Sequence, residues 1–176
     1  MEKCLIKMER FSNRIEALMS EAEIEIENFN LKDGEKIIAY FSEIPTIKGF
    51  PYKIVLVESS DGIIHSGFRQ WDTAYNFTQW TNGIYNLDRL RIIIDKKILS
   101  ETDTAILKKQ FSKLEQIKLP NSIRDEKAII LDGSTWKFGV SLSNKSIDYT
   151  WKATTEDINL FEPIIELIRR QYLDKI

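Results

Sequence analysis

Residues 52–70 of this chain, YKIVLVESSDGIIHSGFRQ, consist of two runs separated by a turn signal. A β-branched apolar run at 52–58 and a second run at 63–70 flank Ser60-Asp61-Gly62, a tripeptide typical of tight turns. This arrangement predicts an antiparallel hairpin. Similar runs on both sides of this hairpin predict further strands at 36–44, 90–98, 128–131, 135–142 and 147–152.

The hydrophobic period changes within the N-terminal quarter of the chain. Phe11, Ile15 and Leu18 follow helical spacing, which predicts an amphipathic helix. Apolar and acidic residues then alternate over residues 22–27, a pattern typical of a half-buried strand. Continuation of the helix is the competing interpretation, because Ala and Glu are good helix formers.

Two further helices are expected. Ser100-x-x-Asp103 resembles an N-terminal capping box and predicts a helix over residues 100–118. A last helix begins near Phe161, since Pro163 is tolerated only in its first turn. Residues 71–86 are polar and aromatic and are expected to form a long loop or short helical turns.

These elements predict the α+β class, with a mainly antiparallel sheet of about seven strands. Three helices, N-terminal, middle and C-terminal, are expected to pack on one side of it. A length of 176 residues fits one domain spanning 1–176. A division at the middle helix, into halves of about 1–99 and 100–176, stays open.

Composition excludes several classes of protein. The net charge is −2, which argues against a non-specific nucleic-acid binder. No stretch approaches the roughly 18 apolar residues of a membrane span. A lone Cys4 cannot form an internal disulfide, and no apolar run of a secretory or lipid-attachment signal precedes it, so a cytoplasmic location is expected.

Catalytic and metal-binding motifs are missing. One cysteine and one histidine, His65, cannot build a Cys/His zinc site, so no metal is expected. His65 lies inside an expected strand, and neither a Gly-x-Ser-x-Gly elbow nor a glycine-rich phosphate loop is present. The sequence assigns no catalytic residue and no cofactor, and it favours a non-enzymatic protein. An enzyme with a carboxylate-based site stays open.

One candidate site is acidic. Residues 1–43 hold six Lys/Arg against ten Asp/Glu, and on a strand four of these acids would share one face. A solvated surface is the simpler interpretation. Such a row of like charges also suits a basic protein partner, as in an immunity-type inhibitor. The acidic row consists of Glu21, Glu23, Glu25 and Glu27.

A second candidate is the aromatic segment 68–85, in which six aromatic residues are interleaved with amides and carboxylates. Flat rings beside such groups can bind a small ligand or a glycan, here through Trp71, Tyr75 and Trp80. The competing interpretation is that these rings fold back onto the sheet as core.

Residues 131–136, LDGSTW, and a second strand ending in Trp151 resemble a group of uncharacterised bacterial proteins with a DG-x-x-W hairpin and a terminal helix. The resemblance covers about residues 100–176. It implies a domain of unknown function and carries no activity. In this pattern Asp132 and Gly133 would form a turn, and Trp136 and Trp151 would pack across a hairpin, which is a structural role.

Overall fold

The computed structural model describes residues 14, 17–45, 51–120, 133–152 and 156–176. Its centre is one antiparallel sheet with the strand order β4-β3-β2-β1-β5-β6. The strands are β1 (Lys36–Ile44), β2 (Tyr52–Glu58), β3 (Ile64–Trp71), β4 (Ile92–Ile98), β5 (Thr135–Ser141) and β6 (Ser146–Trp151). The α+β class with an antiparallel sheet is confirmed, although the described residues hold six strands and not about seven.

Four α-helical segments accompany the sheet in the described part of the chain, and not the three expected; the additional one is α2. They are residues 17–27, α2 (Thr73–Thr81), α3 (Glu101–Gln116) and α4 (Glu162–Arg170). Two short 3₁₀ helices are also present: η1 (Leu87–Arg89) lies between α2 and β4, and η2 (Glu156–Leu160) lies between β6 and α4. The Ser100 hydroxyl accepts a hydrogen bond from the Asp103 amide at 3.1 Å, which confirms the predicted cap of α3. α4 begins where Pro163 predicts it.

The strand expected at residues 22–27 is wrong, because these residues continue a helix. Leu18, Ala22 and Ile26 are buried at intervals of four, whereas Ile24 is 57% exposed. Apolar residues at 22 and 26 fit both a period of two and a helical face. The helix is the stable form because it buries Leu18 on the same face as Ala22 and Ile26. The other expected strand that the sheet lacks, 128–131, lies outside the described residues.

Residues 71–86 were expected to form a long loop or short helical turns, and residues 73–81 form the helix α2. Asp72 caps this helix by accepting a hydrogen bond from the Tyr75 amide at 3.0 Å. Asn76, which is buried, then ties α2 to the start of β4. Its side-chain amide donates to the Arg91 carbonyl and its carbonyl accepts from the Arg91 amide, both at 2.9 Å.

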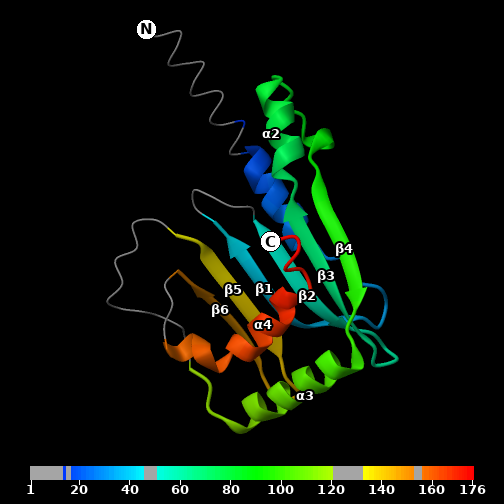
Figure 1. Ribbon diagram of the computed structural model, residues 1–176, viewed down its shortest axis with the longest axis vertical. Helices are drawn as coiled ribbons and strands as arrows, with labels where there is room; N and C mark the ends of the chain where they lie inside the picture. The colour runs from blue at the N-terminus through cyan, green and yellow to red at the C-terminus, as the bar shows by residue number, and fades with distance from the viewer. Residues whose placement is uncertain (1–13, 15–16, 46–50, 121–132, 153–155) are drawn as a thin grey trace.

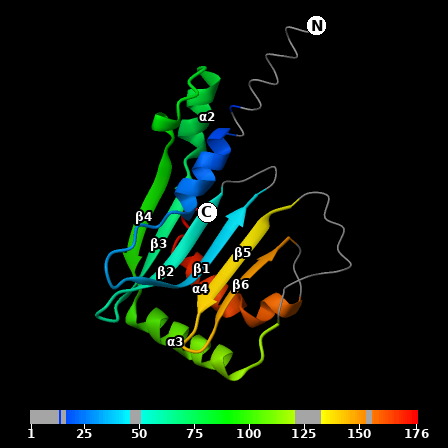
Figure 2. The same cartoon turned by 180° about the vertical axis from the view of Figure 1, so that it is seen from behind.

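The helices lie on both faces of the sheet, which corrects the expected one-sided packing. Figure 1 shows α3 and α4 in front of the strands. Figure 2, from behind, shows residues 17–27 against the opposite face. Ala22 and Ile26 pack there on Trp71. No helix of the described residues has the length and apolar character that crossing a membrane requires.

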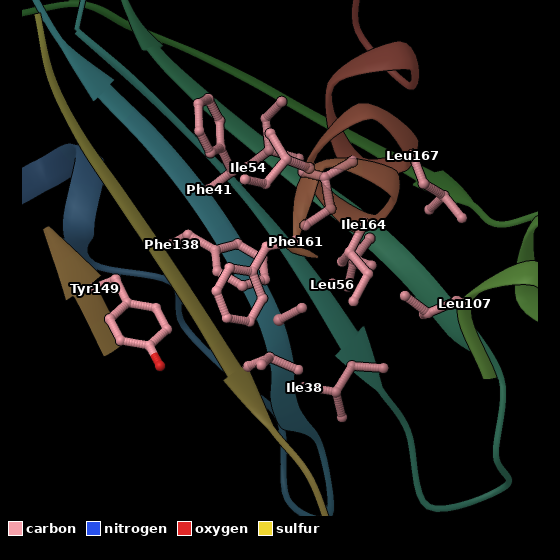
Figure 3. Packing of buried hydrophobic residues seen from close by; sticks show 14 of the residues in the cluster. Ile38, Phe41, Ile54, Leu56, Leu107, Phe138, Tyr149, Phe161, Ile164 and Leu167 are labelled. Atoms are coloured by element: carbon pink, nitrogen blue, oxygen red, sulfur yellow. The ribbon is translucent and has the colours of Figure 1, made fainter. Parts of the chain in front are cut away.

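The main core lies between the sheet and the pair α3 and α4. Phe41 of β1 is opposite Ile54 of β2 on one side and Phe138 of β5 on the other. These side chains point toward Phe161 and Ile164 of the C-terminal helical segment (Figure 3). Burial of such side chains contributes about 1.5–3 kcal/mol each and fixes the sheet against the helices.

Candidate binding groove

A row of four side chains crosses the sheet beside the main core. Tyr52 of β2 is opposite Glu43 of β1, Glu43 is opposite Trp136 of β5, and Trp136 is opposite Trp151 of β6. All four lie on the face that carries α3 and α4, since directly opposite residues share a face. Glu43 therefore places a carboxylate among aromatic rings, on the side of β1 that also carries the core residue Phe41.

The two tryptophans form the floor of a groove. Their rings stack with centroids 6.3 Å apart and an angle of 30° between planes, so the expected pairing of Trp136 with Trp151 is present. Phe41 extends the aromatic floor, with its ring 6.4 Å from that of Trp151. Phe41 and Trp151 are buried, so the half-buried Trp136 is the most exposed ring of the floor.

Glu43 is held in place by two hydroxyl groups. Tyr52 donates to its Oε2 at 3.0 Å and Ser134 donates to its Oε1 at 2.7 Å. Burial, and then the nearby Glu43 carboxylate, raise the pKa of Tyr52 above its usual value. The phenol therefore stays protonated and keeps donating to Glu43 over the physiological range.

α4 forms the wall of the groove. Glu162 and Glu166 are one helical turn apart, and Arg169 follows with its guanidinium 5.8 Å from the Phe41 ring centre. The space between wall and floor has a volume of about 290 Å³. We call it the tryptophan groove; it is lined by Phe41, Glu43, Trp136, Trp151, Ile158, Glu162, Ile165, Glu166 and Arg169.

The groove combines an aromatic floor with an excess of negative charge. Three carboxylates face one guanidinium, a formal net charge of −2. Glu162 and Glu166 make no ion pair with any described residue. Aromatic faces and carboxylates both attract cations, so the groove suits a positively charged group with an apolar stem.

The residues of the acidic row are dispersed by the helix. Neighbouring members point to different sides, since residues two apart are not on one helical face. Glu25 pairs with Arg69 at 3.8 Å, and Glu27 pairs with Lys53 and, at 3.6 Å, with Lys137. These two acids attach the helix to the sheet. Glu23 is exposed and Glu21 half-buried.

The aromatic segment contributes mainly to packing. Trp71 is only 6% exposed, and Trp80 meets it edge to face with ring centres 5.2 Å apart. Tyr75 lies beneath the Arg91 guanidinium at 5.4 Å. The contacts of Trp71 and Trp80 join α2 to the helix at 17–27, as the core interpretation expects.

The remaining residues named in the sequence analysis do not line the tryptophan groove. Asp132 and Cys4 fall outside the described residues, and Gly133 lies two positions before the start of β5. His65 is buried on the opposite face, with Nε2 3.3 Å from Glu35 Oε1 but without a hydrogen bond to a described residue. No group of three metal-binding side chains occurs in the described part of the chain.

The sequence identified Trp136 and Trp151 but missed Glu43, Glu162, Glu166 and Arg169. These charged residues come from β1 and α4, more than 100 positions apart, so no local pattern joins them. One signal was present. In β1 Glu43 follows Phe41 by two positions, which places a carboxylate on the apolar face of a strand.

Comparison with known proteins assigns no family to this chain. No protein-family model matches the chain, and no curated protein matches it significantly.

Proposed function

We propose that this protein is a non-enzymatic binding domain that receives an arginine or lysine side chain of a basic protein partner in the tryptophan groove. One observation carries the proposal: the stacked Trp136 and Trp151 rings share one groove with three carboxylates. Rings supply cation–π attraction and apolar contact for the stem, and the carboxylates supply charge. An immunity-type inhibitor of a basic partner is one form of such a domain.

The ion pairs of the carboxylates favour the tryptophan groove over the acidic row as the binding site for a basic partner. Glu25 and Glu27 already pair with Arg69, Lys53 and Lys137. An external cation would have to displace these internal partners. Glu162 and Glu166 have no such ion pair among the described residues, so their charge remains available to a partner.

Calorimetric titration with hexa-arginine and hexa-glutamate peptides tests the proposal. We expect hexa-arginine to bind and hexa-glutamate not to bind. The double variant Glu162→Gln/Glu166→Gln should weaken binding by about tenfold or more, and the affinity should fall with salt because the attraction is electrostatic. Trp136→Leu, which keeps an apolar floor but removes a π face, should weaken binding by about 3- to 30-fold.

The matched control is Glu21→Gln/Glu23→Gln, which removes the same charge from the acidic row. It should leave affinity unchanged. Loss of binding in this control but not in the groove variant would overturn the groove and favour the acidic row. Absence of hexa-arginine binding to the wild type would overturn the proposal itself. Binding of a neutral oligosaccharide that depends on Trp136 and not on the carboxylates would replace it with a glycan-binding function.

A further inference from the structure

The outer side of β4 is an apolar sheet edge. β4 ends the strand order, and no described strand pairs with its outer side. Ile98 and Ile94 are 73% and 64% exposed, the highest values among the large hydrophobic residues described. Both lie on the face opposite α3 and α4, because they are opposite His65 and Arg69 and not the core-facing Phe68.

The two edges of the sheet differ in chemistry. On the same face, β6 carries Ser146, Asp148 and Thr150, which suits an edge that stays in water. β4 carries isoleucines there, and the apolar surface continues beyond the strand. Ile63 and Leu31 are also exposed; Leu31 lines a small hollow together with Ile94. Figures 1 and 2 show β4 at the border of the sheet. Exposed apolar surface along an unpaired strand is typical of an interaction site.

We propose that β4 pairs antiparallel with β4 of a second copy of this chain, about a two-fold axis at Lys96. On one face of the sheet this register places Ile94 opposite Ile98 of the other copy, and the two-fold axis repeats this pair. On the other face the register places Asp95 opposite Lys97 of the other copy, and the axis repeats this pair as well. Apolar residues meet apolar residues and acids meet bases, as an isologous interface requires.

Neighbouring registers lack this match. An axis at Asp95 would set Asp95 against Asp95 and Ile94 against Lys96. An axis at Lys97 would set Lys97 against Lys97 and Ile98 against Lys96. In the proposed register the only like-charge contact is between the two Lys96 side chains. Each Lys96 Nζ lies 3.6 Å from Glu35 Oε1, which offsets the repulsion.

Asp95 and Lys97 already have partners within the chain, which pairing would have to share or displace. Asp95 binds Lys175. Lys97 Nζ donates to the Gln171 carbonyl at 2.5 Å and lies 3.8 Å from Asp174, on the side of the C-terminal segment. Asp95 Oδ1 also accepts a hydrogen bond from the Lys96 amide at 2.8 Å. A partner carbonyl would take over that amide, which frees the Asp95 oxygen for Lys97 of the other copy.

Analytical ultracentrifugation over a concentration series tests the interface. We expect the wild type to dimerise, and Ile94→Lys and Ile98→Lys each to raise the dimer Kd by about tenfold or more, since each would oppose a charge to an isoleucine. The matched control is Phe77→Lys on α2, whose side chain is 59% exposed and lies outside β4. It should leave the dimer unchanged.

A charge exchange identifies the register. Asp95→Lys alone would set a lysine against Lys97 of the other copy. Lys97→Asp alone would set an aspartate against Asp95, so each variant should be largely monomeric. Mixing the two variants pairs each changed residue with its opposite charge and should restore a heterodimer. If a variant were monomeric because its own fold was damaged, mixing it with the other variant would not restore a dimer.

Three outcomes would overturn the proposal. The first is a wild type that remains monomeric up to about 1 mM, the range of weak association. The second is a dimer that ignores the isoleucine substitutions. The third, provided that circular dichroism shows both charge variants folded, is a mixture that stays monomeric.

Discussion

Gly139 of β5 lies directly between Tyr40 of β1 and Asp148 of β6, and the Tyr40 ring crosses it. The Tyr40 hydroxyl donates to Asp148 Oδ2 at 2.6 Å, two strands away. Burial and the Asp148 carboxylate raise the pKa of Tyr40 above its usual value. Lys53 Nζ is 4.5 Å from the centre of the same ring. Because Gly139 has no side chain, the Tyr40 ring can cross β5 and its hydroxyl can reach Asp148 of β6.

We expect Gly139→Ala to destabilise the protein by about 1–3 kcal/mol, because overpacking must displace the ring. A Cβ at this position would lie 2.2 Å from Tyr40 Cε1. Urea denaturation measures the loss. The matched control is Gly67→Ala in β3, where the nearest atom, Phe29 Cε1, would be 3.1 Å away and the cost should be smaller. An equal or lower cost at position 139 would contradict this account.

At the scale of elements, the strands and helices with strong local signals were predictable. β1 and β2 have the expected bounds, and α3 and α4 begin where the Ser100 cap and Pro163 place them. Residues 22–27 were not predictable by alternation, because the same apolar positions suit a helix and only tertiary packing decides. The groove was half predictable: its tryptophans share a hairpin, whereas its charges meet only through the pairing of distant elements.

The connection between α2 and β4 depends on Asn76, whose side chain replaces a backbone partner for Arg91. We expect Asn76→Ala to cost about 1–3 kcal/mol, because it leaves the Arg91 amide without its bond, whereas the Arg91 carbonyl keeps the Asp72 amide as a donor. Hydrogen exchange at the Arg91 amide should accelerate. Thr78→Ala, on the same helix but exposed, is the control and should change stability little. An Arg91 amide that keeps its protection in Asn76→Ala would refute the proposed role.

At the scale of the whole molecule, His65 makes stability depend on pH. Burial, followed by the Lys96 charge, lowers its pKa, and the nearby Glu35 and Asp61 carboxylates only partly offset this effect, while Lys32 adds to it. The folded protein then binds fewer protons than the unfolded chain. The stabilising contribution is therefore present above the ordinary histidine value of 6.5 and decreases as pH falls below it.

Unfolding free energies measured from pH 7 to about pH 5 should fall in the wild type and stay flatter in His65→Gln. His65 is the only histidine, which makes the comparison clean. The carboxylates with a lowered pKa, Glu35, Asp61, Asp95 and Glu115, act at more acidic pH, below their ordinary values of 3.8–4.5. Identical slopes in the two proteins would show that His65 is not responsible.

The strand order also has a kinetic consequence. Consecutive strands β1 to β4 pair in sequence, so each new pairing closes a comparatively short stretch of chain. β5 instead pairs with β1, and Ala39 and Val140 are opposite although about 100 residues separate them. Closing a loop of that length costs about 4 kcal/mol of chain entropy, against about 2 kcal/mol for the link between β1 and β2. The four-stranded meander should thus assemble first, with the flank of β1 temporarily open to misassociation until the last hairpin arrives.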